Sequence, residues 1–289
     1  MTPVISIVIP CYNDGRHLPE AVASVEACAA PPAFECLIVN DGSTDEGTLA
    51  EFRRLRERGY RVVDQPNLGL GAARNTGIRL AAGEFILPLD SDNRIRPAYL
   101  ARGVDVLRAS PEVGVVYGDA EYFGNRVGRW EVAAFSLERM MRGNYIDACA
   151  VFRRSAWESV GGYDEHMPAM GWEDWDFWLR LALRRWGFRH VPEVLFEYRV
   201  RTGSMISSAN ARGAELLAYM FGKPELEWAR LWRERDRACR EAEAALARVS
   251  RSRDYRLGRA LLAPWRAAKA VMRRSGRPPE SSTPGAASP

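Results

Sequence analysis

The stretch EFILPLDSDNRIRP, residues 84–97, passes from an apolar run directly into acidic and amide side chains. Phe85, Ile86 and Leu87 have the pattern of a buried strand, and Asp90 and Asp92 follow where that strand would end. Two carboxylates two residues apart repel each other, so they need a compensating partner. A divalent cation such as Mg²⁺ or Mn²⁺ is one, because hard cations prefer oxygen ligands. A solvated turn that caps the next helix is the alternative for an isolated Asp-x-Asp pair.

Short apolar runs and helical patterns alternate on both sides of this stretch. The predicted order is strand 4–10, helix 16–30, strand 34–43, helix 44–58, strand 60–66, helix 69–83, strand 84–90, helix 97–110 and strand 113–119. Further along, residues 171–188 have the pattern of an aromatic-rich amphipathic helix, and strand-like residues 189–200 follow. This alternation predicts an α/β protein with a mostly parallel sheet and helices on both faces.

Polar side chains follow four of the predicted strands. They are Asn13 and Asp14 after the first, Asp41 after the second, Asn67 after the third, and Asp90 and Asp92 after the fourth. Ligands of such sheets bind beyond the carboxyl ends of the strands. One binding site built from four strand ends is therefore the simplest interpretation.

Five motifs, in this order over residues 2–205, carry a resemblance to a known family. They are SIVIPCYNDGRHLPEAVASV (6–25), LIVNDGSTDEG (37–47), NLGLGAARNTGI (67–78), LPLDSDNRIRP (87–97) and GWEDWDFWLRL (171–181). Each motif is weak alone, but together they resemble the family 2 inverting glycosyltransferases of bacterial type. The resemblance implies a GT-A fold, which is a Rossmann-like, mixed but mostly parallel sheet with helices on both faces.

The resemblance also implies roles for the strand-end residues. Asp92 would ligate Mn²⁺ or Mg²⁺, and Asp90 would contact the ribose or the water shell of the metal. The implied ligand is a nucleoside-diphosphate sugar, by default a UDP-sugar. The residues expected to hold it are Pro10, Tyr12, Asp14, Asp41, Asn67, Gly71, Arg74, Asp90, Ser91 and Arg201. Tyr12 could stack on the base or pack under its loop, whereas Thr44 and Asp45 are expected to cap a helix.

The acidic segment GWEDWDFW, residues 171–178, is where the resemblance places the general base. Transfer with inversion needs one carboxylate to take the proton of the acceptor hydroxyl. Asp174 would be that base, and Glu173 would orient a sugar. Asp176 is expected to be a surface or capping group, and Trp172 and Trp175 are candidates for sugar stacking. The alternative is that these acids only stabilise the positive end of a helix.

One position departs from the family pattern. Many relatives have a histidine that completes the metal shell, whereas EYRVRTGSMI, residues 197–206, has Arg201 there. Arginine cannot ligate a cation. Either water completes the shell, or Arg201 contacts the diphosphate as a fixed positive charge.

The C-terminal part differs in composition from the rest of the chain. Residues 249–277 have nine basic residues and one acidic residue, whereas residues 1–248 have a small negative net charge. We expect a catalytic domain at 1–222, a charged helix with coiled-coil character at 223–249, a basic amphipathic segment at 250–275 and a disordered tail at 276–289. A solvated helix is the plain interpretation of the basic segment, and adsorption to an anionic membrane is the alternative. This uneven charge does not favour nucleic acid as a partner.

Cysteine and histidine usage sets limits on location and on the type of metal site. The five cysteines are scattered, without CxxC spacing, and there are three histidines, which argues for a reducing compartment and against a zinc site. The N-terminus has a strand pattern rather than a signal-peptide pattern. We expect a cytoplasmic enzyme, free or peripheral on the inner face of the cell membrane, that uses a saccharide or lipid-linked acceptor in polysaccharide or glycolipid synthesis. The charged helix could also pair in a homodimer. The alternative function is a catalytically idle GT-A domain that acts as a binding or scaffolding protein through its C-terminal helices, which the Arg201 departure allows.

Overall fold

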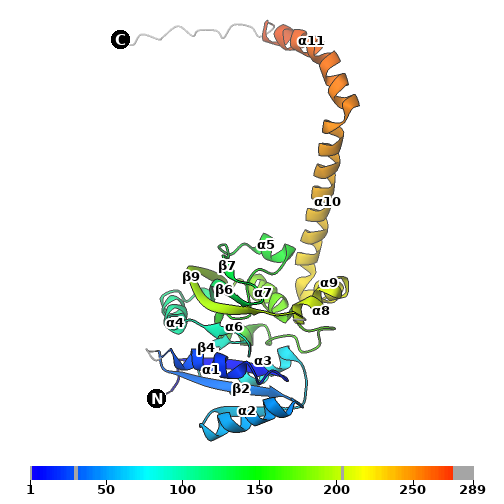
Figure 1. The fold of residues 1–289 in the computed structure, drawn as a ribbon. Helices are drawn as coiled ribbons and strands as arrows, with labels where there is room; N and C mark the ends of the chain where they lie inside the picture. Colours follow the sequence, from blue (N-terminus) through cyan, green and yellow to red (C-terminus); the bar gives the residue numbers. More distant parts are fainter. Residues whose placement is uncertain (1, 29–31, 203–204, 276–289) are drawn as a thin grey trace, which may run out of the picture. The chain divides into compact units, whose positions relative to one another are not determined.

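The computed structural model describes residues 2–28, 32–202 and 205–275 (Figure 1). One compact unit extends to Leu231, and a second unit begins at Trp232. The strands are β1 (Ile5–Cys11), β2 (Phe34–Asp41), β3 (Arg61–Gln65), β4 (Phe85–Pro88), β5 (Arg94–Ile95), β6 (Val113–Gly124), β7 (Gly128–Trp130), β8 (Val151–Arg153) and β9 (Gly187–Val200). The helices of the first unit are α1 (Leu18–Glu26), α2 (Glu46–Glu57), α3 (Leu70–Leu80), α4 (Tyr99–Ala109), α5 (Leu137–Arg142), α6 (Arg154–Ser159), α7 (Glu173–Leu183), α8 (Met205–Ala211), α9 (Gly213–Phe221) and the 3₁₀ helix η1 (Pro224–Leu226).

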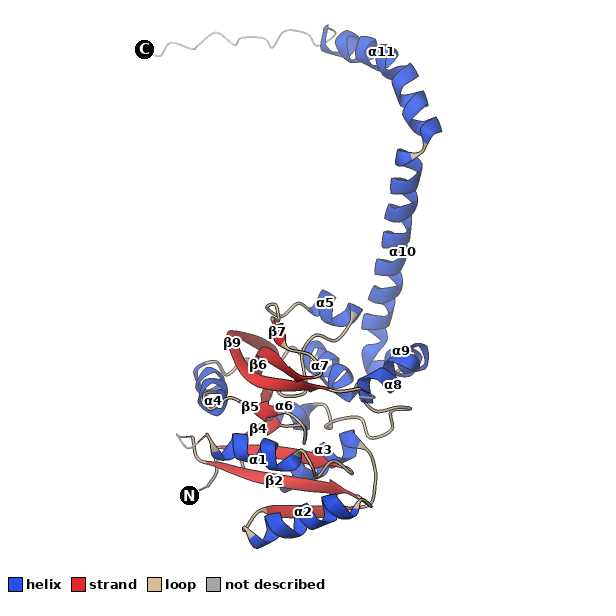
Figure 2. Ribbon diagram, viewed as in Figure 1, coloured by secondary structure: helices blue, strands red, loops and turns tan. Residues whose placement is uncertain are grey.

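The strands form one mixed sheet in the order β3-β2-β1-β4-β8-β6-β9-β5, with β7 paired to β6. The β3, β2, β1 and β4 strands are parallel, as the alternation of strands and helices predicts. β8 then pairs antiparallel with both β4 and β6. β6 and β9 are long parallel neighbours (Figure 2). The predicted α/β class with a GT-A-like mixed sheet is therefore confirmed.

Helices cover both faces of the sheet. Ile7 and Ile9 of β1 belong to a core cluster with Val22 of α1 and Leu100 of α4. Val8 points to the opposite face, because side chains alternate along a strand, and there it packs against α3. A Cβ atom on Gly77 of α3 would lie 2.3 Å from Val8 Cγ1, so only glycine permits this close approach.

The same division continues in β8. Val151 packs against Gly103 of α4 on one face. Phe152 packs on the other face against Phe177 and Trp178 of α7, with ring centroids 5.3 and 6.1 Å apart. The apolar face predicted for the aromatic-rich helix, α7, therefore packs against the sheet. Because α3 and α7 lie on the same face, their polar residues can meet at the edge of the sheet where β1 and β4 end.

The capping of α2 corrects a detail of the sequence prediction. Asp45, not Thr44, is the N-cap residue, because its carboxylate accepts a hydrogen bond from the backbone N–H of Thr48 at 2.7 Å. Thr44 instead hydrogen-bonds Asn13 through both its backbone and its hydroxyl. Thr44 therefore joins the loop after β1 to the loop after β2.

Two long helices complete the described chain. α10 (Glu227–Arg251) begins in the first unit and continues into the second, and α11 (Arg253–Ser275) contains Pro264. None of the helices that the structure describes is long and apolar enough to cross a bilayer. The predicted disordered tail at 276–289 lies outside the described residues, and the predicted domain boundaries stay predictions.

Candidate functional site

The loops after β1 and β4 are joined by a charged hydrogen-bond network. Asp14 is buried, and it accepts hydrogen bonds from Ser91 Oγ at 3.1 Å and from Arg201 Nη1 at 2.9 Å. His17 Nδ1 lies 2.8 Å from the same carboxylate. Arg201 Nε also lies 3.1 Å from Asp92 Oδ2. Four of the predicted site residues therefore lie together at the carboxyl ends of two neighbouring strands.

Asp92 sits in an electrostatically unfavourable place for a carboxylate. Burial and the charge of Asp90 raise the pKa of Asp92 to about 6, although Arg201 acts in the opposite direction. Burial on its own would lower the pKa of Arg201, but Asp92 and Asp14 outweigh it and raise that pKa. The ends of β1 and β4 therefore carry a negative charge that one guanidinium only partly offsets.

Arg74 connects these strand-end acids to α7. Its side chain is 1% exposed, and Nη2 lies 2.7 Å from Asp90 Oδ1 while Nη1 lies 2.7 Å from Glu173 Oε1. Burial would lower the pKa of Arg74, but the two carboxylates raise it well above its ordinary value. The sequence predicts that Arg74 contacts the nucleotide. In the structure it pairs with buried Glu173 and with Asp90, whose side chain is 30% exposed, and the nucleotide contact stays a prediction. It brings the two acidic motifs, 83 residues apart from Asp90 to Glu173 by numbering, into one site.

Asp174 lies beside this bridge at the start of α7. Its Oδ2 accepts a hydrogen bond of 2.9 Å from Asn144 Nδ2, and its Oδ1 caps the backbone N–H of Trp175. Burial raises the pKa of Asp174 well above its ordinary value, and the charges of Glu173 and Asp147 add to the shift. A carboxylate with a raised pKa is a stronger proton acceptor than an ordinary one. Burial and the neighbouring charges are thus compatible with the predicted role of Asp174 as the base, which stays a prediction.

Asp147 is an acid of this site that the sequence pattern does not indicate. Its Oδ1 accepts a hydrogen bond of 2.8 Å from the backbone of Cys149. Burial raises the pKa of Asp147 to about 7, and the charge of Asp90 contributes. The residue precedes β8, which runs antiparallel to β4, so the beginning of β8 lies at the same edge of the sheet as the end of β4. Asp147 is not predicted from the sequence because the predicted strand-end residues follow parallel strands, whereas Asp147 precedes an antiparallel strand.

Tyr198 of β9 is a second residue that the sequence does not indicate. Burial and the carboxylates of Asp147, Asp90 and Asp92 raise its pKa. Its ring packs edge-on against Trp130, with centroids 5.8 Å apart. Tyr198 therefore joins the acidic site to an aromatic cluster with Trp130 and Tyr122.

Asp41 organises the loop between β3 and α3. It is buried and accepts hydrogen bonds from Gln65 Nε2 at 2.7 Å and from the backbone N–H groups of Leu68 and Gly69 at 2.9 and 3.0 Å. Gly71 is packed against the next segment, because an added Cβ would lie 2.7 Å from the carbonyl oxygen of Asp164. Both residues have packing reasons of their own, separate from the predicted nucleotide contact.

The remaining predicted nucleotide contacts lie around this edge. Pro10 is buried within β1, where it pairs with Val39 of β2. Tyr12 and Asn67 are exposed on the loops that follow β1 and β3. Tyr12 is 48% exposed, so part of its side chain is accessible for the predicted stacking on a base, which stays a prediction.

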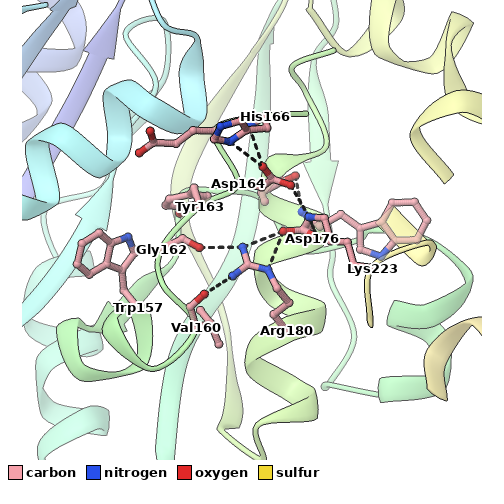
Figure 3. Close-up of polar contacts among 12 residues, drawn as sticks. Trp157, Val160, Gly162, Tyr163, Asp164, His166, Asp176, Arg180 and Lys223 are labelled. Atoms are coloured by element: carbon pink, nitrogen blue, oxygen red, sulfur yellow. Dashed lines mark hydrogen bonds and ion pairs between the residues drawn. The ribbon is translucent and has the colours of Figure 1, made fainter. Parts of the chain in front are cut away.

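Asp176 overturns the expectation of a surface acid. It is fully buried and accepts from Arg180 Nε at 2.8 Å and from Lys223 Nζ at 2.6 Å (Figure 3). Lys223 also pairs with Asp164, and Arg180 donates to the carbonyl groups of Val160 and Gly162. The network fastens the loop at 160–166 and the segment before η1 to the helix that carries Asp174.

The two tryptophans expected to stack on sugars have structural partners. Trp175 is 4% exposed, its Nε1 donates to the carbonyl of Met140, and its ring packs against Phe221. Trp172 is half-buried, and its Nε1 donates to Asn210 Oδ1 at 3.1 Å. Burial leaves Trp175 no free face for a sugar, so that expectation is wrong for Trp175.

The donor set of the site fits a hard cation that also binds phosphate. Asp90 and Asp92 supply two carboxylates, and Mg²⁺ or Mn²⁺ commonly uses one or two carboxylates together with substrate phosphates and water. Among the described residues, no three His, Cys, Asp or Glu side chains come together as a preformed cage.

Comparison with known proteins identifies the family. The sequence profile of "Glycosyl transferase family 2" matches residues 6–161, and that of "Glycosyltransferase like family 2" matches residues 142–233. The chain is 38% identical over 223 residues to the putative glycosyltransferase EpsH of Bacillus subtilis, covering 71% of this chain and 63% of that protein. It is 28% identical over 202 residues to the chondroitin synthase of Escherichia coli, covering 67% of this chain and 28% of the synthase. The chain thus spans less than two thirds of either relative.

Solved structures show the same fold. Residues 1–349 of Staphylococcus aureus TarS in complex with UDP-GlcNAc match with a TM-score of 0.59 and 20% identity, over 75% of this chain and 65% of that one. The mannosyltransferase PcManGT of Pyrobaculum calidifontis, in complex with GDP-Man and Mn²⁺, matches with a TM-score of 0.59 and 20% identity, over 93% of this chain and 87% of that one. With a family profile that covers more than half of its length and a GT-A-type sheet, the chain belongs to glycosyl transferase family 2.

Proposed function

We propose that this protein transfers a sugar from a nucleoside-diphosphate sugar, by default a UDP-sugar, to a hydroxyl acceptor with inversion at the anomeric carbon. The observation that carries the proposal is the Arg74 bridge, in which one guanidinium pairs with Asp90 after β4 and with Glu173 at the start of α7. It brings together the loop with the acids proposed to hold a metal-bound diphosphate and the helix with the acid proposed to accept the proton. The TarS complex with UDP-GlcNAc and the PcManGT complex with GDP-Man, both of proteins with the same fold, support a nucleoside-diphosphate sugar as the donor.

Asp174 is the proposed general base. The acceptor oxygen forms a bond to the anomeric carbon, the bond from that carbon to the diphosphate oxygen breaks, and the acceptor proton passes to Asp174. The raised pKa of Asp174 favours this transfer, and Asn144 holds the carboxylate in place. Glu173 is held by Arg74 and by the backbone of Gly171, so it positions the start of α7 rather than taking a proton.

Asp92, with Asp90, would hold the divalent cation, Mn²⁺ or Mg²⁺. When bound there, the cation supplies positive charge to the diphosphate leaving group. Asp14 and Ser91 hold the two loops in register through their mutual hydrogen bond. Tyr12 is proposed to stack on the base, and its exposure on the loop after β1 supports this role. The Mn²⁺ complex of the mannosyltransferase neighbour supports the metal.

The proposed acceptor is a saccharide or lipid-linked saccharide in polysaccharide or glycolipid synthesis, and the proposed setting is the cytoplasmic face of a membrane. The basic helix α11 exposes Leu257, Leu261, Leu262 and Trp265. Apolar side chains among arginines suit the surface of an anionic bilayer. The protein should pellet with phosphatidylglycerol-rich vesicles at low salt and not with neutral ones, and failure to pellet with either would remove this part of the proposal. A homodimer through α10 stays a prediction.

A donor assay tests the proposed activity. Purified protein is incubated with UDP-glucose, UDP-GlcNAc or GDP-mannose, with Mn²⁺ or with EDTA, and release of the nucleoside diphosphate is measured with and without a lipid extract as acceptor source. Metal-dependent release that disappears in Asp174→Asn supports a transferase. A catalytically idle scaffold would bind a nucleotide but release no diphosphate in any arm, and this result would replace the proposal.

A further inference from the structure

Arg201 occupies an unusual position at the end of β9. Its Nη1 lies 2.9 Å from Asp14 Oδ1, and its Nε lies 3.1 Å from Asp92 Oδ2. The guanidinium thus spans two loops that follow different strands, β1 and β4. It places a positive charge directly on the carboxylate proposed for the metal.

The two arginines of the site differ in their freedom to move. Arg74 is 1% exposed and is enclosed by Asp90 and Glu173, so it cannot leave without exposing a buried charge. The side chain of Arg201 is 36% exposed, so solvent reaches part of it. Arg199, nearby on β9, donates to the carboxylate of Glu20 and to the backbone carbonyl of Asp92 rather than to the carboxylates of Asp14 and Asp92. Arg201 is therefore the guanidinium that can change partners.

A divalent cation and Arg201 would compete for the carboxylate of Asp92. Arginine offers only N–H donors and cannot join a metal shell, so a cation bound to Asp92 would repel the guanidinium from the same carboxylate. A diphosphate provides an alternative partner, because the planar guanidinium binds phosphate oxygens with two parallel hydrogen bonds. When cation and diphosphate bind together, Arg201 can leave Asp92 and pair with the diphosphate. When the cation binds alone, Arg201 loses Asp92 and keeps only Asp14 as a partner.

We infer that Arg201 is a stand-in cation: it pairs with Asp92 and Asp14 until donor and cation bind, and it then exchanges Asp92 for the donor diphosphate. The inference rests on the proposed function and adds an order of events to it. Metal alone binds weakly, because it must displace Arg201 with nothing to receive the guanidinium. The diphosphate binds measurably without metal, because Arg201 supplies positive charge.

Direct binding measurements test the exchange without using activity. Mn²⁺ binding without nucleotide is followed by electron paramagnetic resonance, and UDP and UMP binding in EDTA by calorimetry. In Arg201→Gln, we expect Mn²⁺ alone to bind about tenfold or more tightly and UDP in EDTA to bind about tenfold or more weakly, as expected for loss of a charge-assisted contact. UMP, which lacks the second phosphate, should change by less than about threefold. Arg201→Lys, which retains the charge, should fall between the wild type and Arg201→Gln.

A matched control is Arg102→Gln, because Arg102 is an exposed arginine that pairs with Glu193 on the surface. It should bind Mn²⁺, UDP and UMP like the wild type. If Arg201→Gln leaves both the Mn²⁺ and the metal-free UDP affinities unchanged while the wild type binds UDP with Mn²⁺, the exchange is wrong and the proposed function stands. If the wild type binds neither UDP nor GDP with or without Mn²⁺, the proposed function fails and the inference falls with it.

Discussion

Replacing Arg74 with methionine tests whether this arginine holds the site together. Methionine fills similar space without charge and leaves the carboxylate of Glu173 buried with no cation. Removing one partner of a buried ion pair costs about 3 to 5 kcal/mol, because the remaining charge is uncompensated. The loss of the Asp90 pair adds less to this cost, since the side chain of Asp90 is 30% exposed and water can solvate its charge. We therefore expect the free energy of unfolding to fall by about 3 to 5 kcal/mol in Arg74→Met.

Urea denaturation at pH 7.5 in EDTA, followed by tryptophan fluorescence, measures this loss. With a urea m-value of about 3 kcal/mol/M, the transition midpoint should move down by roughly 1 to 2 M. The penalty should shrink as the pH is lowered towards the range in which carboxyl groups take up protons, because a neutral acid needs no counter-charge. Adding Glu173→Gln to Arg74→Met should recover about half of the loss or more, since it removes the more deeply buried charge.

Arg79→Met is the matched control. Arg79 lies on the same helix, α3, and pairs with Glu165 at 3.2 Å, but its side chain is 53% exposed. An exposed pair contributes about 1 kcal/mol or less, so this variant should denature close to the wild type. If Arg74→Met keeps the stability of the wild type and loses only nucleotide affinity, Arg74 serves the ligand and the reasoning from burial is refuted.

Three further substitutions test other parts of the structure. Asp174→Asn should lower transfer by about 10² to 10⁴ while UDP affinity in calorimetry stays within about twofold, because it removes the proton acceptor alone; equal loss of binding would contradict this. Asp147→Asn should raise the free energy of unfolding in urea by about 2 to 4 kcal/mol at pH 8 and by almost nothing near pH 4. The sign follows because folding raises the pKa of Asp147 from 3.8 to about 7. The ionised side chain therefore destabilises the folded state as the pH rises above 3.8, and this destabilisation is complete above about pH 7. An effect of the substitution that does not change with pH would refute this prediction. Lys223→Met should lower thermal and urea stability by about 3 kcal/mol, because it leaves buried Asp176 with Arg180 as its remaining partner, and unchanged stability would show that Arg180 suffices.

The parallel half of the fold is predictable because each strand in it is a short apolar run followed by polar residues. In a parallel sheet such residues share one edge, so the sequence alone groups Asp14, Asp90 and Asp92. Asp147 escapes prediction for the opposite reason. β8 has three residues and runs antiparallel to β4, so its beginning, not its end, reaches the site. A single sequence does not give the direction of so short a strand.

The burial of Arg74 and Asp176 does not follow from local pattern either. Each lies on a helix face whose exposure depends on a partner far along the chain: Glu173 for Arg74, and Lys223 for Asp176. Helical spacing places Asp176 two residues from Asp174 and hence on another face, which is correct. It does not show that this other face is covered by the loop at 160–166 and by the segment before η1.

The charge balance of the site explains how the fold keeps so many acids together and what a ligand would gain there. Carboxylates from several elements converge, and the guanidinium groups of Arg74 and Arg201 contact four of them: Asp90, Glu173, Asp14 and Asp92. Asp147 and Asp174 have hydrogen bonds to neutral groups, and burial raises the pKa of both. The site is therefore more negative than its own arginines can neutralise. A divalent cation bound at Asp92 would bring two positive charges to it, and the diphosphate of the proposed donor would give Arg201 an anionic partner in exchange. Binding of both would therefore relieve a repulsion between carboxylates that folding alone leaves in place.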